Sequence, residues 1–318
     1  MAASTSAKPA PRGDAHAASV SSNKRLRRPD HEAKPEVKAG YIHMPDRRSG
    51  IQRKASRELV RFSDTGLRRF GSIISSAGAP QLAPKHLVLL PGLDGTGELF
   101  ADFIAALPES WTATTVAYPT DRFLSYTALR PFVSAAVPQS KRFVLVAESF
   151  SAPLAVWYAA TNPPSLVAVV MCAGFVGSPV PGWSGIVKAL AKPWLFRLKP
   201  PRTVLEYLLL GQNAPPDLLQ KLHHALHRVS PDVLSGRVQE VLDCDARDDL
   251  RRTTVPLLYL EATHDRLLSS YCKKEVSHLR PDTLFRSVPA PHLLLQREPK
   301  KAATIMMAFI SSLSPSPD

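Results

Sequence analysis

From His86 onward, short apolar runs alternate with stretches in which apolar residues recur every three or four positions. Apolar runs such as His86–Leu90 and Leu166–Cys172 show no polar alternation, a pattern typical of strands buried on both faces. The same criterion predicts four more strands, at 113–118, 143–146, 257–261 and 283–288. Helical spacing predicts helices at 98–107, 126–137 and 152–161. The fold class predicted for residues 86–318 is therefore α/β, with a mainly parallel sheet covered by helices on both faces.

One segment, residues 176–249, interrupts this alternation. It contains no convincing strand, is rich in proline and has a helix-like pattern. Because a long insertion after a sheet strand commonly forms a lid or a binding element, we expect a helical cap here. The first part of this cap is strongly apolar and forms either ordinary core or the wall of a pocket. These apolar residues are Trp183, Ile186, Val187, Leu190, Trp194, Leu195, Phe196 and Leu198.

The first 85 residues follow a different pattern. Residues 1–50 are mostly Ala, Ser, Pro and basic residues, with too few large apolar side chains to offset the entropy of ordering, so a disordered basic tail is predicted. The start of the tail lacks the apolar core of a secretory signal, and its acidic residues argue against a transit peptide. Residues 51–85 are ambiguous, because glycines interrupt any sustained period. Met1 and Met44 both stay open as the first residue.

Charge is concentrated in this leading part of the chain. The 318 residues carry a formal net charge of +13, and residues 1–85 hold 17 Lys and Arg against 7 Asp and Glu. The cluster Lys24-Arg25-Leu26-Arg27-Arg28 fits contact with an anionic surface or a nuclear signal, although short basic runs are common by chance. A solvated tail is the favoured interpretation. No specific nucleic-acid partner is predicted, and peripheral membrane contact through the tail stays an open alternative.

The cysteines, the apolar stretches and the histidines indicate which compartment, membrane segment or metal site can be expected. The three cysteines are widely spaced and odd in number, which favours neither a disulfide framework nor a zinc site. The longest nearly uncharged apolar stretch, 166–177, is shorter than the ~20 residues of a membrane-spanning helix. His223 and His227 have a spacing that can bind metal, but a packed or solvated helix face is the favoured interpretation. We expect a cytoplasmic protein without a metal site.

A candidate nucleophile lies in the tight turn after the strand at 143–146. The turn reads Ala147-Glu148-Ser149-Phe150-Ser151, with small residues two before and two after the central serine. A sharp strand-to-helix turn that exposes a nucleophilic hydroxyl leaves room only for small side chains at those two positions. Glycine is usual at both, so Ala147 and Ser151 are a mild departure. Serine is also favoured at helix N-caps, and the pentapeptide alone is equally compatible with a structural role.

A neutral serine requires a general base within hydrogen-bond reach and an acid that orients the base. Asp265 follows the strand at 257–261, and His292 follows the strand at 283–288. Ser149, Asp265 and His292 therefore come after three separate strands, in the chain order Ser, Asp, His. These three residues are the candidate catalytic triad.

Two backbone amides are candidates for an oxyanion hole. The amide of Phe150 comes directly after the candidate nucleophile, at the start of a helix, where the dipole is positive. The amide of Leu93 lies in the loop 91–97, whose three glycines permit a backbone turned toward the crevice. This loop has neither a Gly-Lys-Ser/Thr sequence nor a G-x-G-x-x-G pattern, so phosphate binding is disfavoured.

Taken with these motifs, residues 86–315 resemble the α/β-hydrolase superfamily, in which elbow, oxyanion loop, acid and terminal histidine occur in this order. The sequences Leu-Pro-Gly-Leu-Asp-Gly-Thr-Gly, Ala-Glu-Ser-Phe-Ser and Pro-His-Leu-Leu-Leu-Gln are similar to those of uncharacterised bacterial esterase-like hydrolases. They are more distantly similar to those of pimeloyl-ester esterases and plant phytyl ester synthases. The resemblance implies a serine esterase or an acyltransferase. The two leading strands of the superfamily are poorly marked in residues 51–85.

The expected activity is hydrolysis of a carboxylic ester, or of a thioester, through an acyl-enzyme, with no metal ion or organic cofactor. The apolar cap indicates a small-molecule ester with an apolar acyl group as the partner. Acyl transfer to an alcohol and a binding module without catalysis are the alternatives.

Overall fold

The computed structural model describes residues 84–197 and 202–313. The tail predicted at 1–50 and all but the last two residues of the segment 51–85 lie outside the described residues. Both therefore stay predictions.

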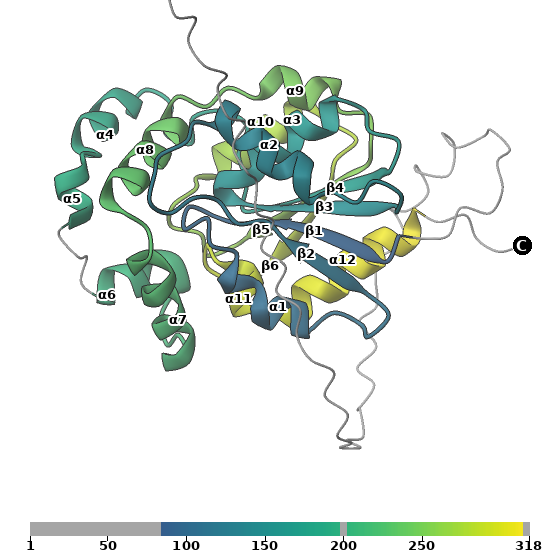
Figure 1. Ribbon diagram of the computed structural model, residues 1–318, viewed down its shortest axis with the longest axis horizontal. Coiled ribbons are helices and arrows are strands. Elements are labelled where there is room, and N and C mark those ends of the chain that lie inside the picture. The colour runs from purple at the N-terminus through teal and green to yellow at the C-terminus, as the bar shows by residue number, and fades with distance from the viewer. Residues whose placement is uncertain (1–83, 198–201, 314–318) are drawn as a thin grey trace, which may run out of the picture. The chain divides into compact units, whose positions relative to one another are not determined.

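Six strands form one parallel sheet in the order β2-β1-β3-β4-β5-β6 (Figure 1). The chain runs from β1 to β2 on one side and then places β3 on the other side of β1. At such a reversal the loops that follow the two neighbouring strands separate and leave a crevice at the carboxyl ends of the strands. The strands are β1 (His86–Leu90), β2 (Thr112–Thr115), β3 (Phe143–Glu148), β4 (Leu166–Cys172), β5 (Leu257–Ala262) and β6 (Leu284–Val288).

The central strands are buried on both faces. In β1, Leu87 and Leu89 pack into the core on one face of the sheet, and Val88 and Leu90 pack into the core on the other. Helices cover both faces (Figure 1), which confirms the predicted fold class. One face is covered by α2 (Tyr126–Ala136), α3 (Ala152–Ala160), α9 (Arg247–Arg252) and α10 (Ser270–Leu279), and the other by α1 (Ala101–Ala105), α11 (Leu294–Arg297) and α12 (Pro299–Ser312).

The predicted helical cap is confirmed between β4 and β5. An isolated antiparallel bridge between Gly177 and Asp245 lies at its base. The cap helices lie together on one side of the sheet, at the left of Figure 1. They are α4 (Ser184–Leu190), α5 (Pro193–Arg197), α6 (Arg202–Leu205), the π-helical turn η3 (Glu206–Leu210), α7 (Pro216–His227) and α8 (Pro231–Leu242).

The apolar first part of the cap is exposed, so its prediction as core or pocket wall is wrong for most of its members. Trp183 is 66% exposed, Leu190 60% and Trp194 55%, and Ile186, Val187 and Leu195 are also exposed. Phe196 packs inward, and Leu198 lies outside the described residues. The reason is that α4 and α5 contact α8 through their other sides. No helix in 84–197 or 202–313 has the length and apolar content needed to cross a membrane.

Candidate active site

Ser149 lies in the turn between β3 and α3, in the short 3₁₀ helix η2 (Ser149–Ser151). Its φ angle is +46°, in the left-handed region that residues other than glycine rarely adopt. Ala147 and Ser151 on either side are fully buried, whereas Ser149 is partly exposed and lines a pocket. The turn therefore presents the hydroxyl above the end of the sheet, as the motif at 147–151 predicts.

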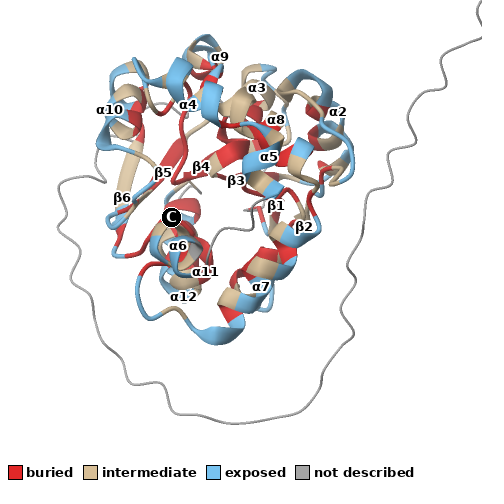
Figure 2. Ribbon diagram, turned by 90° about the vertical axis from the view of Figure 1, so that its left-hand side faces the viewer, coloured by how far each residue is buried: buried red, intermediate tan, exposed pale blue. Residues whose placement is uncertain are grey.

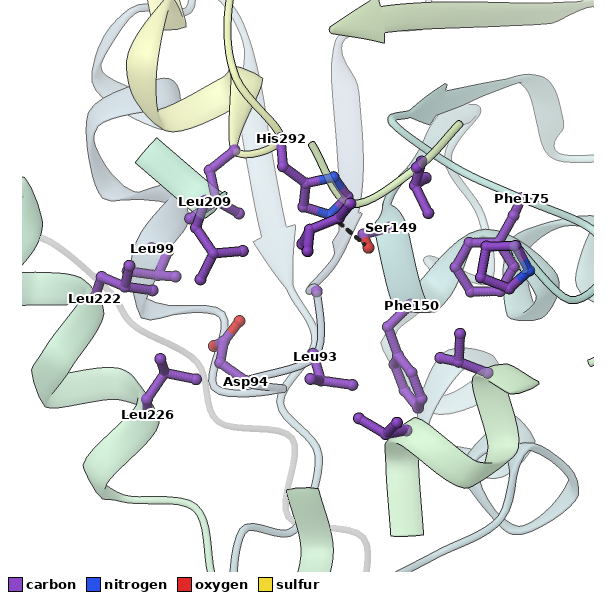
Figure 3. A pocket seen from close by; sticks show the side chains of 17 residues that line it. Leu93, Asp94, Leu99, Ser149, Phe150, Phe175, Leu209, Leu222, Leu226 and His292 are labelled. Carbon is purple, nitrogen blue, oxygen red and sulfur yellow. Dashed lines mark hydrogen bonds between the residues drawn. The ribbon is translucent and has the colours of Figure 1, made fainter. Parts of the chain in front are cut away.

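The structure brings the three candidate catalytic side chains together. The Nε2 atom of His292 lies 2.8 Å from the Oγ atom of Ser149 (Figure 3). The Nδ1 atom of His292 lies 2.7 Å from the Oδ2 atom of Asp265. The side chains of His292 and Asp265 are only 4% and 9% exposed. With Nδ1 protonated toward the carboxylate, Nε2 is the acceptor for the serine proton.

Backbone contacts hold the acid and the base in place. The second carboxylate oxygen of Asp265, Oδ1, accepts hydrogen bonds from the amides of Leu267 at 2.8 Å and Leu268 at 3.0 Å. The amide of His264 donates to the carbonyl of Ala290 at 3.0 Å, which joins the loops after β5 and β6. Because Asp265 lies in the loop after β5 and His292 lies in the loop after β6, these bonds set the orientation of the His292 imidazole ring relative to Asp265.

The loop after β1 lies beside the elbow, because β1 and β3 are neighbours in the sheet. Gly95 has a φ of +69°, and its amide donates to the carbonyl of Gly92 at 3.1 Å. Leu93 and Phe150 both line the pocket at Ser149 (Figure 3). The two residues predicted to supply oxyanion amides therefore line the same pocket as the candidate nucleophile.

Arg237, which the sequence analysis did not single out, supports this loop from α8. Its side chain donates from Nη1 to the carbonyls of Leu93 and Asp94, at 2.8 Å each, and from Nη2 to the carbonyl of Pro119 at 2.9 Å. Arg237 is 2% exposed. Burial lowers the pKa of its guanidinium, an effect that the nearby Asp94 opposes. A signal was present in the sequence, because helical spacing from Val233 places Arg237 on the buried face of α8.

Ser151 joins the elbow to the same loop. Its hydroxyl donates to the carbonyl of Pro91 at 2.5 Å, so the Tyr118 hydroxyl, 2.9 Å away, is the donor to Ser151. Tyr126 also donates to the carbonyl of Phe150, at 2.8 Å. Glycine at position 151 would supply none of the hydroxyl contacts, so the departure from glycine has a structural reason.

Glu148, immediately before Ser149, is a buried carboxyl group. Its Oε2 atom accepts a hydrogen bond from Gln296 at 3.2 Å, and its Oε1 atom has no hydrogen-bond partner among the residues described. Burial raises the pKa of Glu148 to about 8, and Asp94 adds to the rise. The carboxyl group is therefore mostly neutral at pH 7.

An apolar pocket with a volume of about 260 Å³ opens beside Ser149. Figure 3 shows Ser149 and His292 facing it together with aliphatic side chains from the cap. Its polar contributors are few, which is typical of a site for an apolar group. The cap and loop residues that form its apolar wall include Leu99, Phe175, Pro179, Leu209, Leu222, Leu226, Val238 and Val241.

Two competing features do not form a second site. Burial raises the pKa of Cys172 well above its usual value, so its thiol stays protonated and is a poor nucleophile. The rings of His223 and His227 lie side by side, with centroids 6.0 Å apart. Within the described part of the chain, no group of three or more His, Cys, Asp or Glu residues is arranged to hold a metal ion.

No protein-family model and no curated protein sequence matches this chain. Solved structures do resemble it. A carboxylesterase of the ammonia-oxidizing thaumarchaeon Nitrososphaera gargenis has a TM-score of 0.61 and 14% identity, covering 72% of this chain and 91% of its own. An esterase from Exiguobacterium antarcticum has a TM-score of 0.61 and 14% identity, covering 72% and 92%. A hydrolase from Oleispira antarctica has a TM-score of 0.59 and 13% identity, covering 71% and 91%. The chain has the α/β-hydrolase fold.

Proposed function

We propose that this protein is a serine hydrolase that cleaves carboxylic esters with an apolar acyl group. The observation that carries the proposal is the hydrogen-bonded series from Asp265 through His292 to the Oγ atom of Ser149, at the edge of an apolar pocket. The esterases among the similar structures agree with this class of activity.

In the acylation step, the Oγ atom of Ser149 attacks the ester carbonyl carbon while its proton passes to Nε2 of His292. The electron pair of the carbonyl double bond moves to oxygen, which forms a tetrahedral oxyanion. When the intermediate collapses, the bond to the alkoxy oxygen breaks, and His292 returns the proton to the leaving alcohol. Asp265 stabilises the imidazolium ion and keeps the ring in the productive tautomer.

Deacylation repeats these steps with water. His292 removes a proton from the attacking water, the acyl carbon becomes tetrahedral again, and the proton returns to Ser149 as the carboxylic acid leaves. The same groups act on a thioester without change.

The developing oxyanion is assigned to the amides of Leu93 and Phe150. One such donor typically contributes about 3 to 4 kcal/mol to transition-state stabilisation. The contacts of Arg237 to the Leu93 carbonyl and of Ser151 to the Pro91 carbonyl support this role, because they hold the two donor segments together before substrate binds.

A fluorophosphonate probe tests the nucleophile. We expect stoichiometric labelling of the wild-type protein and of a Ser311→Ala control, which removes an exposed serine on α12. We expect no labelling of Ser149→Ala. Equal labelling of the two variants would contradict the assignment of Ser149.

A series of p-nitrophenyl esters tests the acyl preference. The pocket wall from the cap predicts that kcat/KM for octanoate exceeds that for acetate by at least about tenfold, since each buried methylene contributes about 0.8 kcal/mol. A preference for acetate would refute the apolar acyl group while leaving the nucleophile assignment intact.

A further inference from the structure

The outer side of α4 and α5 is an exposed apolar surface, which we name the cap face. Figure 2 looks onto this side and shows both helices largely exposed. Exposed apolar surfaces of this kind on a folded domain usually mark an interaction site. The cap face consists of Trp183, Ile186, Val187, Leu190, Trp194 and Leu195, whose exposed fractions range from 36% to 66%.

The apolar stripe of α4 points away from the protein. Trp183, Ile186, Val187 and Leu190 have the spacing of a single helix face, and this spacing ordinarily faces a core. Instead, α4 has no buried residue. A helix whose apolar side faces outward is arranged for a partner that is itself apolar.

Polar contacts attach this helix to α8. The carbonyl of Ala191, directly after α4, accepts hydrogen bonds from the hydroxyl of Ser235 at 2.7 Å and from the side-chain amide of Gln239 at 3.3 Å. Lys188 forms an ion pair with Asp243. The orientation of α4 is therefore held by specific bonds, so the exposure of its apolar residues is a built feature of the cap.

The charged residues of the sequence segment that contains the cap face all have one sign. Residues 149–205 contain no aspartate or glutamate, although they contain Lys188, Lys192, Arg197, Lys199 and Arg202. Lys192 and Arg197 are exposed beside these apolar residues, whereas Lys188 is paired with Asp243. Exposed apolar residues that include tryptophan, with basic residues next to them in the sequence, are the composition of segments that lie in the interface of anionic membranes.

The basic charge of this segment disfavours two other binding partners of the cap face, a second copy of the chain and the chain's own leading 85 residues. A symmetric pairing with a second copy would bring the basic residues of both copies together without an acidic partner from this segment. The leading 85 residues are also strongly basic and would be repelled in the same way.

We propose that the cap face is a membrane-binding surface, which inserts its tryptophan and aliphatic side chains into the interface of a bilayer containing anionic phospholipid. Phe196 connects this surface to the pocket. It packs on the inner side of α5 against the cluster of Val229, Val233 and Leu234, against which Leu93 and Leu226 of the pocket wall also pack. Membrane binding by the cap face does not require the proposed hydrolase activity.

Sedimentation with vesicles tests the surface. The full chain carrying Ser149→Ala is mixed with vesicles of phosphatidylcholine and phosphatidylglycerol, or of phosphatidylcholine alone. We expect tighter binding to the anionic vesicles. The added pair Ile186→Ser and Leu190→Ser should weaken binding at least tenfold, because each removed aliphatic side chain contributes more than a tenfold factor when buried. The matched control, Ile104→Ser on α1, removes an exposed aliphatic residue elsewhere and should bind like the parent.

Tryptophan fluorescence supplies a second readout. Quenching by brominated phosphatidylcholine in anionic vesicles should be strong in the parent and largely lost in the variant Trp183→Phe with Trp194→Phe, since Trp111 and Trp157 lie outside the cap face.

Three outcomes would overturn the proposal. The first is an absence of binding to anionic vesicles. The second is unchanged binding after the cap substitutions, with loss on replacing Lys24, Arg25, Arg27 and Arg28 by alanine, which would assign binding to the tail. The third is a dimer, detected by light scattering, that the cap substitutions dissociate while vesicle binding is absent, which would make a second copy the occupant.

Discussion

Glu148 provides a quantitative test of the buried electrostatics at the elbow. Its carboxyl group has a pKa near 4.5 when solvated, and burial beside Asp94 raises the pKa to about 8. Between these two values the unfolded chain has lost the proton while the folded chain keeps it. The contribution of Glu148 to stability is therefore fully present below about pH 4.5 and is lost as the pH rises toward 8.

The magnitude follows from the width of this interval. Each pH unit corresponds to about 1.36 kcal/mol, so the free energy of unfolding falls by about 5 kcal/mol over the whole range because of this one group. Glu148→Gln keeps the size of the side chain but has no proton to lose in this range. The variant should therefore gain stability relative to wild type by about 1.4 kcal/mol for each pH unit.

Urea unfolding at about pH 5.5, 6.5 and 7.5 measures this difference. Other titrating groups cancel in the comparison of variant with wild type at each pH. Glu109→Gln, at an exposed loop position, is the matched control and should show no such trend. A difference between Glu148→Gln and wild type that stays constant with pH, or that shrinks as the pH rises, would refute the buried neutral carboxyl.

Three further predictions follow from the loop and the pocket. Arg237→Met should lower kcat for ester hydrolysis up to about 100-fold with a smaller effect on KM, because the Leu93 segment loses its support; steady-state kinetics measures this. Gly95→Ala should lower the free energy of unfolding by about 1 to 3 kcal/mol, since its Cβ would lie 2.4 Å from Arg237 at a φ of +69°; in denaturant unfolding Gly185→Ala, with open space around it, should be neutral or slightly stabilising. Leu222→Trp should narrow the pocket and lower kcat/KM for octanoate about tenfold more than for acetate in the p-nitrophenyl series.

Much of the fold could be predicted because the strands are buried on both faces. An apolar run such as Leu166–Cys172 has only one stable environment, between two layers of helices, and its bounds were predicted without error. Helix α10 was missed for the opposite reason. Only Cys272 and Val276 of its ten residues are buried, so its apolar periodicity is weak.

The convergence of Ser149, Asp265 and His292 could be predicted because each follows a strand, and parallel strands end at one edge of a sheet. The side chains that hold the loops of this site in place could not be predicted in the same way. Arg237 and Ser151 act through bonds to backbone carbonyls, and any residue can supply a carbonyl. Helical spacing indicates that Arg237 is buried, but it does not indicate which carbonyls the side chain contacts. The cap face was misjudged because a helical apolar stripe indicates a contact but does not say whether the contact is internal.

The hydrogen bonds of Arg237 join the cap to the loops that follow β1 and β2. They limit how freely the cap could be exchanged for that of another protein. A chimaera that received its cap from another hydrolase would be competent only if the transplanted helix carried a donor at the same place, because the carbonyls of Leu93, Asp94 and Pro119 otherwise lose this partner. By the same reasoning, a large swing of the cap away from the sheet would disengage the guanidinium. The cap would then be open when product leaves, and the loop at Leu93 would be preorganised only while the cap is closed.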